Sequence, residues 1–223
     1  MSGARHTDAT LDGWVRFVFD HPVTETAWHF DIDAPDLVLP PERAADLIAE
    51  TFERGAELLR PFTDAQLNQG FWFLVSSGNS DYMCALTNAS VPWPARKRAL
   101  RAFVPLFREV MATRCTPSLS HLDEPGTALN SACYMWWDII LLCPPLDARQ
   151  PREPIHDEVL AVLAELLEVR HDACRESALH GLGHWAPHDP AAKSVIEAFL
   201  ARGEGLRPEL LAYARAARTG CIQ

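Results

Sequence analysis

The sequence predicts an all-α fold built from antiparallel pairs of helices. Apolar residues recur every three or four positions through most of the chain, which is the period of an amphipathic helix. Prolines stand in the first turn of several of these segments, where a missing N–H costs nothing, and most paired segments are joined by short turns. About four such pairs follow one another at intervals of roughly 45 residues, a repeat length typical of an α-α superhelix. We therefore expect one solenoid domain over residues 1–223.

The first forty residues are expected to form a short helix followed by an irregular wrap. Residues 11–19 place apolar side chains at helical spacing behind Thr10, a candidate N-cap, although their partial alternation also suits a strand. Residues 21–40 contain three prolines and four acidic residues, a composition that breaks regular structure. We expect Trp28 and Phe30 to anchor this wrap on the rest of the fold.

Eight helical segments are expected to follow, in four pairs. The paired segments are 41–60 with 63–80, 92–115 with 126–143, 153–170 with 172–185, and 190–203 with 207–220. Thr63 and Gln66 have the spacing of a capping box at the start of their helix. Residues 126–143 are apolar on nearly all sides, which indicates a central helix.

Composition excludes several classes of partner. The chain has 20 Lys and Arg against 30 Asp and Glu, and a net charge of −10 repels a phosphate backbone, so we expect no nucleic-acid partner. The six cysteines form no C-x-x-C pair, which favours free thiols and a cytoplasmic location. Residues 1–13 lack the apolar stretch of a signal peptide, and the longest apolar run, 132–143, contains Asp138 and is too short to cross a bilayer. We therefore expect no membrane partner.

One stretch has the residue order of a known repeat. Its members are Leu166 and Leu167 in an apolar helix, then Asp172, Arg175, Ala178, Leu182 and Gly183, and finally Asp189 with Pro190 at the next helix. This order resembles the HEAT-like repeat, in particular its phycobilisome-lyase type. The resemblance implies an α-solenoid in which Asp172 is the N-cap of a second helix and Arg175 reaches the turn of a neighbouring repeat. It also implies that the second helices line a concave face.

That face is our predicted binding site. The polar and aromatic residues expected on it are Gln66, Gln69, Trp72, Tyr134, Trp137, Asp138, His180 and His184. Tyrosine and tryptophan are enriched at protein interfaces, and we find no complete catalytic constellation, so the sequence favours a non-enzymatic scaffold that binds a protein or peptide without a cofactor. A carboxylate among apolar neighbours is expensive to bury alone. We therefore expect Asp138 to pair with an arginine of the adjacent repeat or to line a groove.

A metal-assisted hydrolase or ligand-binding enzyme is the alternative function. His180 and His184 are four residues apart, which lets two imidazoles share a zinc ion, and His188 or Asp189 could supply a third ligand. Gly181 occupies the position of the catalytic Glu in H-E-x-x-H zinc proteases, so that general base is absent.

Two further groups of residues are candidate metal or ligand sites. The polar loop with His121, Asp123, Glu124 and Asn130 could also carry a site, but we expect it to be a solvated connection. The dipeptide of His171 and Asp172 resembles that of the metal-dependent HD phosphohydrolases, yet it falls at a helix start, where a cap is needed.

DNA binding is a third, weaker alternative. The HEAT-like DNA glycosylases use cationic concave surfaces, and this chain has one basic run, with Arg96, Lys97, Arg98, Arg101 and Arg108. These residues lie on the first helix of a pair, which is expected to face outward. We therefore interpret the run as a solvated face.

Overall fold

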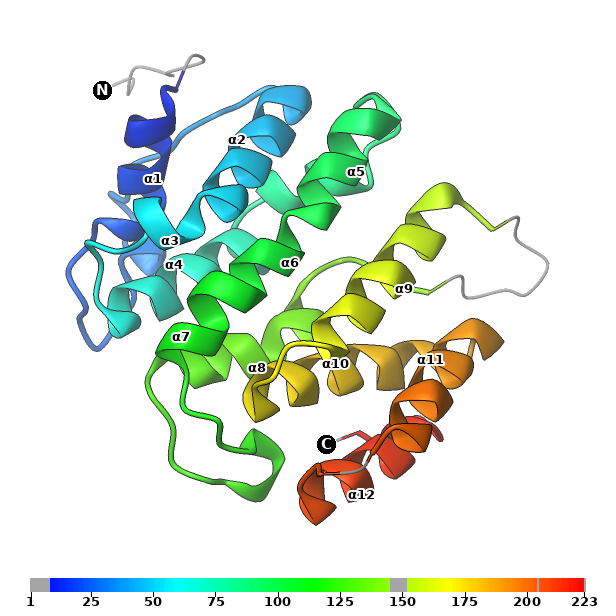
Figure 1. The fold of residues 1–223 in the computed structure, drawn as a ribbon. Coiled ribbons are helices and arrows are strands. Elements are labelled where there is room, and N and C mark those ends of the chain that lie inside the picture. The colour runs from blue at the N-terminus through cyan, green and yellow to red at the C-terminus, as the bar shows by residue number, and fades with distance from the viewer. Residues whose placement is uncertain (1–8, 145–151, 204, 223) are drawn as a thin grey trace. The chain divides into compact units, whose positions relative to one another are not determined.

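The computed structural model of the protein describes residues 9–144, 152–203 and 205–222. Helices are the regular secondary structure of these ranges, which contain no strand, and this confirms the all-α prediction (Figure 1). Residues 1–8, on which the expectation of a missing signal peptide partly rests, lie outside the described residues.

The helices gather into two compact units, and each is described by itself. Unit 1 comprises residues 1–106 and 139–141, and unit 2 comprises residues 107–138 and 142–223. A single solenoid domain would require a particular arrangement of the two units, so this expectation stays a prediction.

Unit 1 begins with the expected short helix. α1 spans Leu11–Phe19, and the Thr10 hydroxyl accepts a hydrogen bond from the Gly13 N–H at 3.2 Å, so the predicted cap is confirmed. The other helices of this unit are α2 (Pro41–Glu53), α3 (Gly55–Leu58), α4 (Asp64–Val75), α5 (Trp93–Arg101) and α6 (Phe103–Pro105), with 3-10 helices η1 (Trp28–Phe30) and η2 (Tyr82–Leu86). The predicted capping box is present at the start of α4, because Thr63 and Gln66 bond each other's backbone N–H.

Packing in unit 1 differs from the expected pairing of 41–60 with 63–80. α2 lies mainly along α5, whereas α4 lies mainly along α1, although the Phe52 and Phe71 rings of α2 and α4 remain 6.3 Å apart. The reason is that α1 packs apolar side chains against α4, where Gly70 leaves room for the Phe19 ring. A Cβ atom at Gly70 would lie 2.3 Å from that ring, so only glycine allows this approach.

Two expected helices are interrupted. The helix over 41–60 breaks at Arg54, before Gly55, and the helix over 92–115 is divided by a π-helix, η3 (Leu106–Met111), that precedes α7 (Ala112–Arg114). Pro105 explains the second interruption, since proline lacks an N–H and its ring displaces the carbonyl four residues before it. The hydrogen-bond ladder then widens locally.

Unit 2 contains helices from the last three predicted pairs. They are α7, α8 (Leu129–Ile139), α9 (Pro154–Leu167), α10 (Asp172–Trp185), α11 (Pro190–Ala201) and α12 (Pro208–Ala217), with the 3-10 helix η4 (Ser120–Leu122) in the loop before α8. α9 packs on α10 and α11 on α12, while across the two hairpins α9 packs on α11 and α10 on α12 (Figure 1). Two stacked hairpins produce this neighbour pattern.

The roles predicted for the repeat motif are partly confirmed. Pro190 is the first residue of α11, and Asp189 caps this helix by accepting a hydrogen bond from the Ala191 N–H at 2.9 Å. Gly183 is tightly packed, since a Cβ there would lie 2.4 Å from Ile222. Gly183 therefore allows Ile222 to approach this side of α10 closely.

Two roles in the motif are wrong. His171 occupies the N-cap position of α10 and Asp172 is the first helical residue, so Asp172 is not the cap. The Arg175 guanidinium donates to the Leu167 carbonyl at 3.2 Å, at the end of α9 in its own hairpin rather than in a neighbouring one. The turn between α9 and α10 is short, and it brings this carbonyl within reach of Arg175.

The sequence predicts no membrane-spanning helix and no disulfide bond. Among the described residues every helix is too short or too polar to cross a membrane. All six cysteines are described and all are free thiols, as the sequence predicts.

Candidate functional site

In unit 1 the irregular wrap of residues 21–40, here called the acidic segment, is held by hydrogen bonds from α4. The side-chain amides of Gln66 and Gln69 each donate to the His21 carbonyl at 3.2 Å, and Gln69 also donates to the Pro22 carbonyl at 3.3 Å. These two glutamines, predicted as a binding surface, therefore hold the start of the acidic segment in place.

Aromatic residues fix the rest of the acidic segment. Trp28 stacks on His21 with ring centroids 3.7 Å apart and lies 4.6 Å from the Phe73 ring of α4. Near the end of the segment, the Tyr82 hydroxyl donates to the carbonyl of buried Leu37 at 2.5 Å. Trp28 is thus an anchor, as predicted, whereas Phe30 is 65% exposed and is not.

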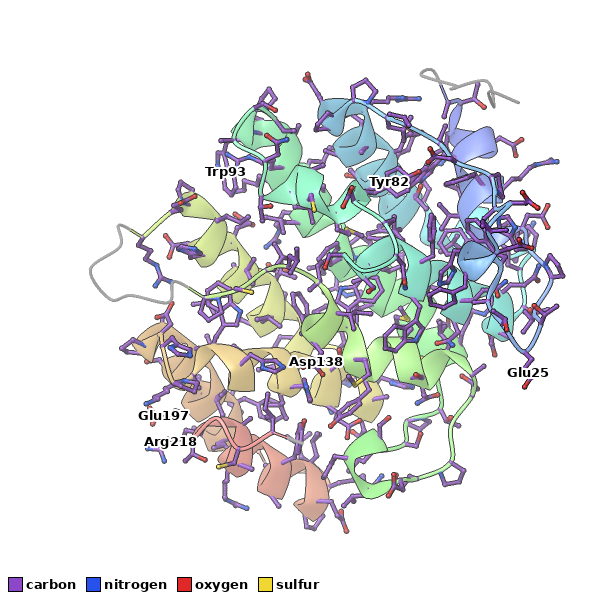
Figure 2. All side chains as sticks on the ribbon, turned by 180° about the vertical axis from the view of Figure 1, so that it is seen from behind. Glu25, Tyr82, Trp93, Asp138, Glu197 and Arg218 are labelled. Atoms are coloured by element: carbon purple, nitrogen blue, oxygen red, sulfur yellow. The ribbon has the colours of Figure 1, made fainter. Side chains whose placement is uncertain are left out.

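The outer side of the acidic segment combines exposed apolar groups with negative charge. Its exposed apolar side chains are Val23, Phe30, Ile32 and Val38. Its carboxylates are Glu25, Asp31, Asp33 and Asp36, and residues 21–40 contain no Lys or Arg. Within the described residues no cation pairs with these four groups, and Glu25 projects away from the ribbon (Figure 2).

Two hollows border the acidic segment. One, of about 590 Å³, is lined by segment residues between His21 and Pro35. The other, of about 510 Å³, lies between the end of the segment and η2, where Asp36, Asp81 and Tyr82 contribute polar groups. The surface therefore has depressions beside its exposed apolar side chains.

In unit 2 a carboxylate lies between two histidines. Asp138, near the end of α8, accepts a hydrogen bond from His180 Nε2 at 2.8 Å through Oδ2 and is hydrogen-bonded to His184 Nε2 through Oδ1. Partial burial raises the pKa of Asp138, but the hydrogen bonds from His180 and His184 outweigh it and hold the pKa well below its usual range. Asp138 therefore pairs with histidines and not with the arginine that we expected.

Two tyrosines extend this contact on the other side of His180. The Tyr213 hydroxyl of α12 lies 2.6 Å from His180 Nδ1, and the Tyr134 hydroxyl of α8 lies 3.4 Å from that of Tyr213. Burial, together with the neighbouring Tyr134, raises the pKa of Tyr213. Both ring nitrogens of His180 thus have oxygen partners, in a residue that is only 4% exposed.

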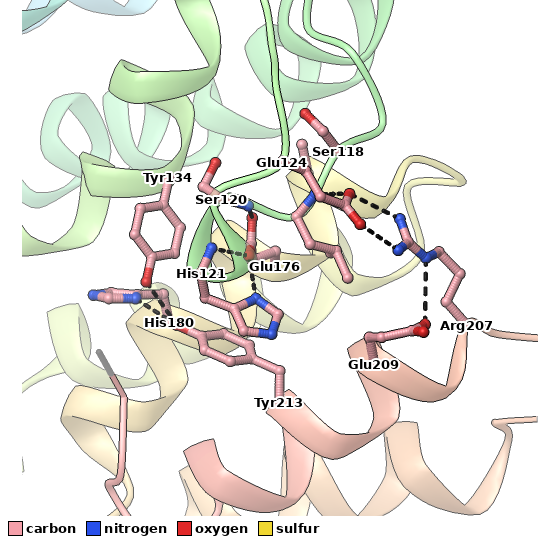
Figure 3. A network of polar contacts seen from close by, with 12 residues as sticks. Ser118, Ser120, His121, Glu124, Tyr134, Glu176, His180, Arg207, Glu209 and Tyr213 are labelled. Atoms are coloured by element: carbon pink, nitrogen blue, oxygen red, sulfur yellow. Dashed lines mark hydrogen bonds and ion pairs between the residues drawn. The ribbon is translucent and has the colours of Figure 1, made fainter.

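The loop before α8 docks on α10 through Glu176 (Figure 3). This carboxylate is fully buried and accepts hydrogen bonds from the N–H groups of Ser120 and His121 at 2.8 and 3.0 Å and from His121 Nδ1 at 2.5 Å. The His121 ring in turn stacks on Tyr213 at 4.2 Å. The expected solvated connection is therefore wrong, because a buried charge holds this loop.

The same loop has two further attachments. The side-chain oxygen of Asn130, Oδ1, accepts hydrogen bonds from the backbone N–H groups of Thr116 and Thr127. Glu124 forms a bidentate ion pair with Arg207, in the segment before α12, at 2.6 and 3.1 Å. Asp123, by contrast, is exposed in a left-handed backbone conformation with φ of 54°. This geometry leaves Asp123 outside the polar network.

Comparisons with known proteins give no match. No protein-family model, curated protein or solved structure matches this chain. The HEAT-like resemblance therefore stays a prediction.

The predicted concave-face residues fall into both units. Gln66, Gln69 and Trp72 belong to unit 1, and the other five belong to unit 2. In unit 2, Tyr134, Asp138, His180 and His184 come together in one network, but Trp137 is buried against Gly181 of α10.

Two metal sites that the sequence offers as alternatives are not assembled. His188 is exposed, and Asp189 caps α11 and pairs with Arg152 at 2.6 Å, so neither joins His180 and His184. His171 bonds the Cys115 carbonyl through Nε2 at 3.1 Å, which gives it a structural role. In the basic run, Arg98 pairs with Glu53 at 2.6 Å and is thereby used locally.

Sequence reasoning missed Glu176 and Tyr213. The argument that identified Asp138 does not find Glu176, because the sequence neighbours of Glu176, Arg175 and Ser177, are polar. Tyr213 also gave no signal, because a tyrosine in an amphipathic helix is ordinary core.

The ion pair between Glu124 and Arg207 predicts a pH dependence. Hydrogen bonds from Arg207 and from the Leu119 N–H lower the pKa of Glu124 to about 2. Because the folded-state pKa is depressed, the stability from this group is present above the ordinary pKa of about 4.5 and is lost as the pH falls towards 2. We expect the difference in unfolding free energy between wild type and Glu124→Gln to shrink between these pH values. Arg207→Gln in both backgrounds should reduce that dependence to the part that comes from the Leu119 N–H. A difference unchanged at low pH would show the pair to be unimportant.

Proposed function

We propose that this protein is a non-enzymatic binding module whose docking surface for a protein partner is the acidic segment of unit 1. The observation that supports this is the concentration of exposed apolar groups. Of the six large apolar side chains exposed in the described residues, four lie in residues 21–40, and Ile32 is 98% exposed. Apolar side chains grouped beside charged ones mark interaction surfaces more often than scattered ones do.

The charge of the acidic segment indicates the kind of partner. Four carboxylates and no Lys or Arg give residues 21–40 a net charge of −4, and the whole chain has −10. Complementary charge speeds association and excludes wrong partners. We therefore expect a basic protein surface that carries an apolar side chain for one of the hollows, and not a nucleic acid.

The fixed conformation of the acidic segment favours binding. Gln69, Trp28 and Tyr82 hold its backbone at three points while Phe30 and Ile32 stay exposed. A loop that is already ordered loses less conformational entropy on association than a flexible one. This arrangement moves our predicted interface from the second helices to the acidic segment, which one of them, α4, holds in place. A concave HEAT-like face and a cytoplasmic location stay predictions.

Two matched variants test this function. Phe30→Ser with Ile32→Ser removes exposed apolar groups from the acidic segment, and Leu122→Ser with Leu141→Ser removes the same number elsewhere. In affinity capture from the native host, we expect the segment variant to retain its protein partner at least about tenfold less than wild type, and the control to retain it equally. Retention should also fall between about 50 and 500 mM NaCl, since the contact is electrostatic. Equal retention by the two variants would contradict the proposal.

A further inference from the structure

We propose that Asp138, His180 and His184 of unit 2 form a binding site for a divalent transition-metal ion. One carboxylate oxygen and one nitrogen from each imidazole all lie within 4.8 Å of one another. Metal–ligand bonds of roughly 2.0–2.2 Å place such atoms about 3 Å or more apart, so small side-chain rotations admit an ion among them. This site is independent of the acidic segment.

The helices deliver these three groups without distortion. His180 and His184 stand one turn apart on α10, and their ring centroids are 5.0 Å apart. Asp138 reaches them from α8, which approaches α10 closely at Gly181. A Cβ there would lie 2.7 Å from the Trp137 ring, the residue beside Asp138. Gly181 is thus the residue that permits the contact between the carboxylate and both imidazoles.

The chemistry of the donors points to zinc or a neighbouring first-row ion. Imidazole nitrogens suit zinc, copper, iron and nickel, and one carboxylate with two histidines gives a mixed nitrogen and oxygen set with one negative charge. Three protein ligands also leave at least one coordination position open for water or an anion. The side chains of Asp138 and His184 are 23% and 39% exposed, so an ion can enter from the surface.

The hydrogen bond between Tyr213 and His180 Nδ1 is of the type that orients a metal-binding histidine. Histidines that bind a metal through one nitrogen donate the other N–H to a neighbouring oxygen, which fixes the ring. Tyr213 Oη lies 2.6 Å from His180 Nδ1 and can accept this hydrogen bond, with Tyr134 next to it. Without an ion, the Tyr213 hydroxyl can instead donate to His180 Nδ1, and Asp138 can accept hydrogen bonds from Nε2 of both His180 and His184. Metal titration distinguishes these two arrangements.

The test uses untagged full-length protein, stripped of metal and titrated with Zn²⁺ by calorimetry, and with Co²⁺ followed by visible absorption. We expect one ion per chain. His184→Gln, a partly exposed position at which folding should persist, is expected to weaken Zn²⁺ binding by at least about 100-fold. His188→Gln is the matched control on the same stretch of chain and should leave the affinity unchanged.

A positioning role for Tyr213 gives a second readout. Tyr213→Phe keeps the ring but removes the oxygen behind His180, and we expect a loss of Zn²⁺ affinity of roughly 10–100-fold, with one ion still bound. Circular dichroism of each metal-free variant checks that the helices remain. Failure of the wild type to bind one ion, or equal weakening by His184→Gln and His188→Gln, would overturn the proposal.

Discussion

Glu176→Ala is expected to lower the free energy of unfolding by about 3–5 kcal/mol, since it removes one partner from a buried charged contact. The Glu176 carboxylate is fully buried and accepts three hydrogen bonds from Ser120 and His121. Without it, two backbone N–H groups and an imidazole lose their acceptor in a site from which water is largely excluded. Chemical denaturation measures this change, and hydrogen exchange should show faster exchange at the Ser120 and His121 amides.

Glu197→Ala is the matched control for this prediction. Glu197 also pairs with a cation, Arg218, at 2.7 Å, but both side chains are about half exposed (Figure 2). Exposed pairs contribute little, so we expect a change within about 1 kcal/mol. If Glu176→Ala had an effect as small as Glu197→Ala, the loop before α8 would not depend on the buried charge.

Trp14→Ala is expected to destabilise unit 1 by about 3–5 kcal/mol, the usual cost of removing a large side chain from a core. Trp14 is fully buried in α1, and its Nε1 donates to the Thr51 hydroxyl at 3.1 Å. The Trp14 ring also lies edge to face with the Tyr82 ring of η2, with centroids 4.8 Å apart. Removing Trp14 therefore also weakens the packing of Tyr82, whose hydroxyl holds the acidic segment. Thermal or denaturant unfolding followed by tryptophan fluorescence and circular dichroism provides the measurement.

Two variants separate packing from hydrogen bonding at this position. Trp14→Phe keeps an aromatic ring but removes the donor to Thr51, and we expect it to cost clearly less than Trp14→Ala. Phe30→Ala removes an aromatic group that is 65% exposed, and we expect a change within about 0.5 kcal/mol. A Phe30→Ala effect as large as that of Trp14→Ala would mean that the acidic segment is part of the core.

Helix positions were predictable because they depend on local chemistry. The predicted caps at Thr10 and Thr63 follow from side chains that satisfy backbone N–H groups within a few residues, and both are present. The cap predicted at Asp172 is absent, because His171 occupies that position. The break at Arg54 was not predictable from periodicity, because the apolar stripe continues through it. The π-helix after Pro105 shows instead that a proline can widen a helix as well as end it.

The candidate sites were only partly predictable because they depend on contacts between distant segments. The spacing of His180 and His184 indicated a shared ligand, but their third partner, Asp138, is 42 residues before His180 and was expected to pair with an arginine. The exposure of Ile32 likewise has no sequence signal, since an isoleucine is usually buried. Both results come from tertiary packing, which periodicity does not encode.

Site-specific photo-crosslinking from position 32 tests the binding function most directly. In one variant a photoreactive amino acid replaces Ile32 in the acidic segment, and in a control variant of the same chain it replaces Leu122. Both variants are irradiated in the native host. We expect a crosslink from position 32 to a basic stretch of a partner protein, weakened by Asp31→Asn with Asp33→Asn, and no such product from position 122. A partner that crosslinks from position 122 and not from position 32 would contradict this expectation.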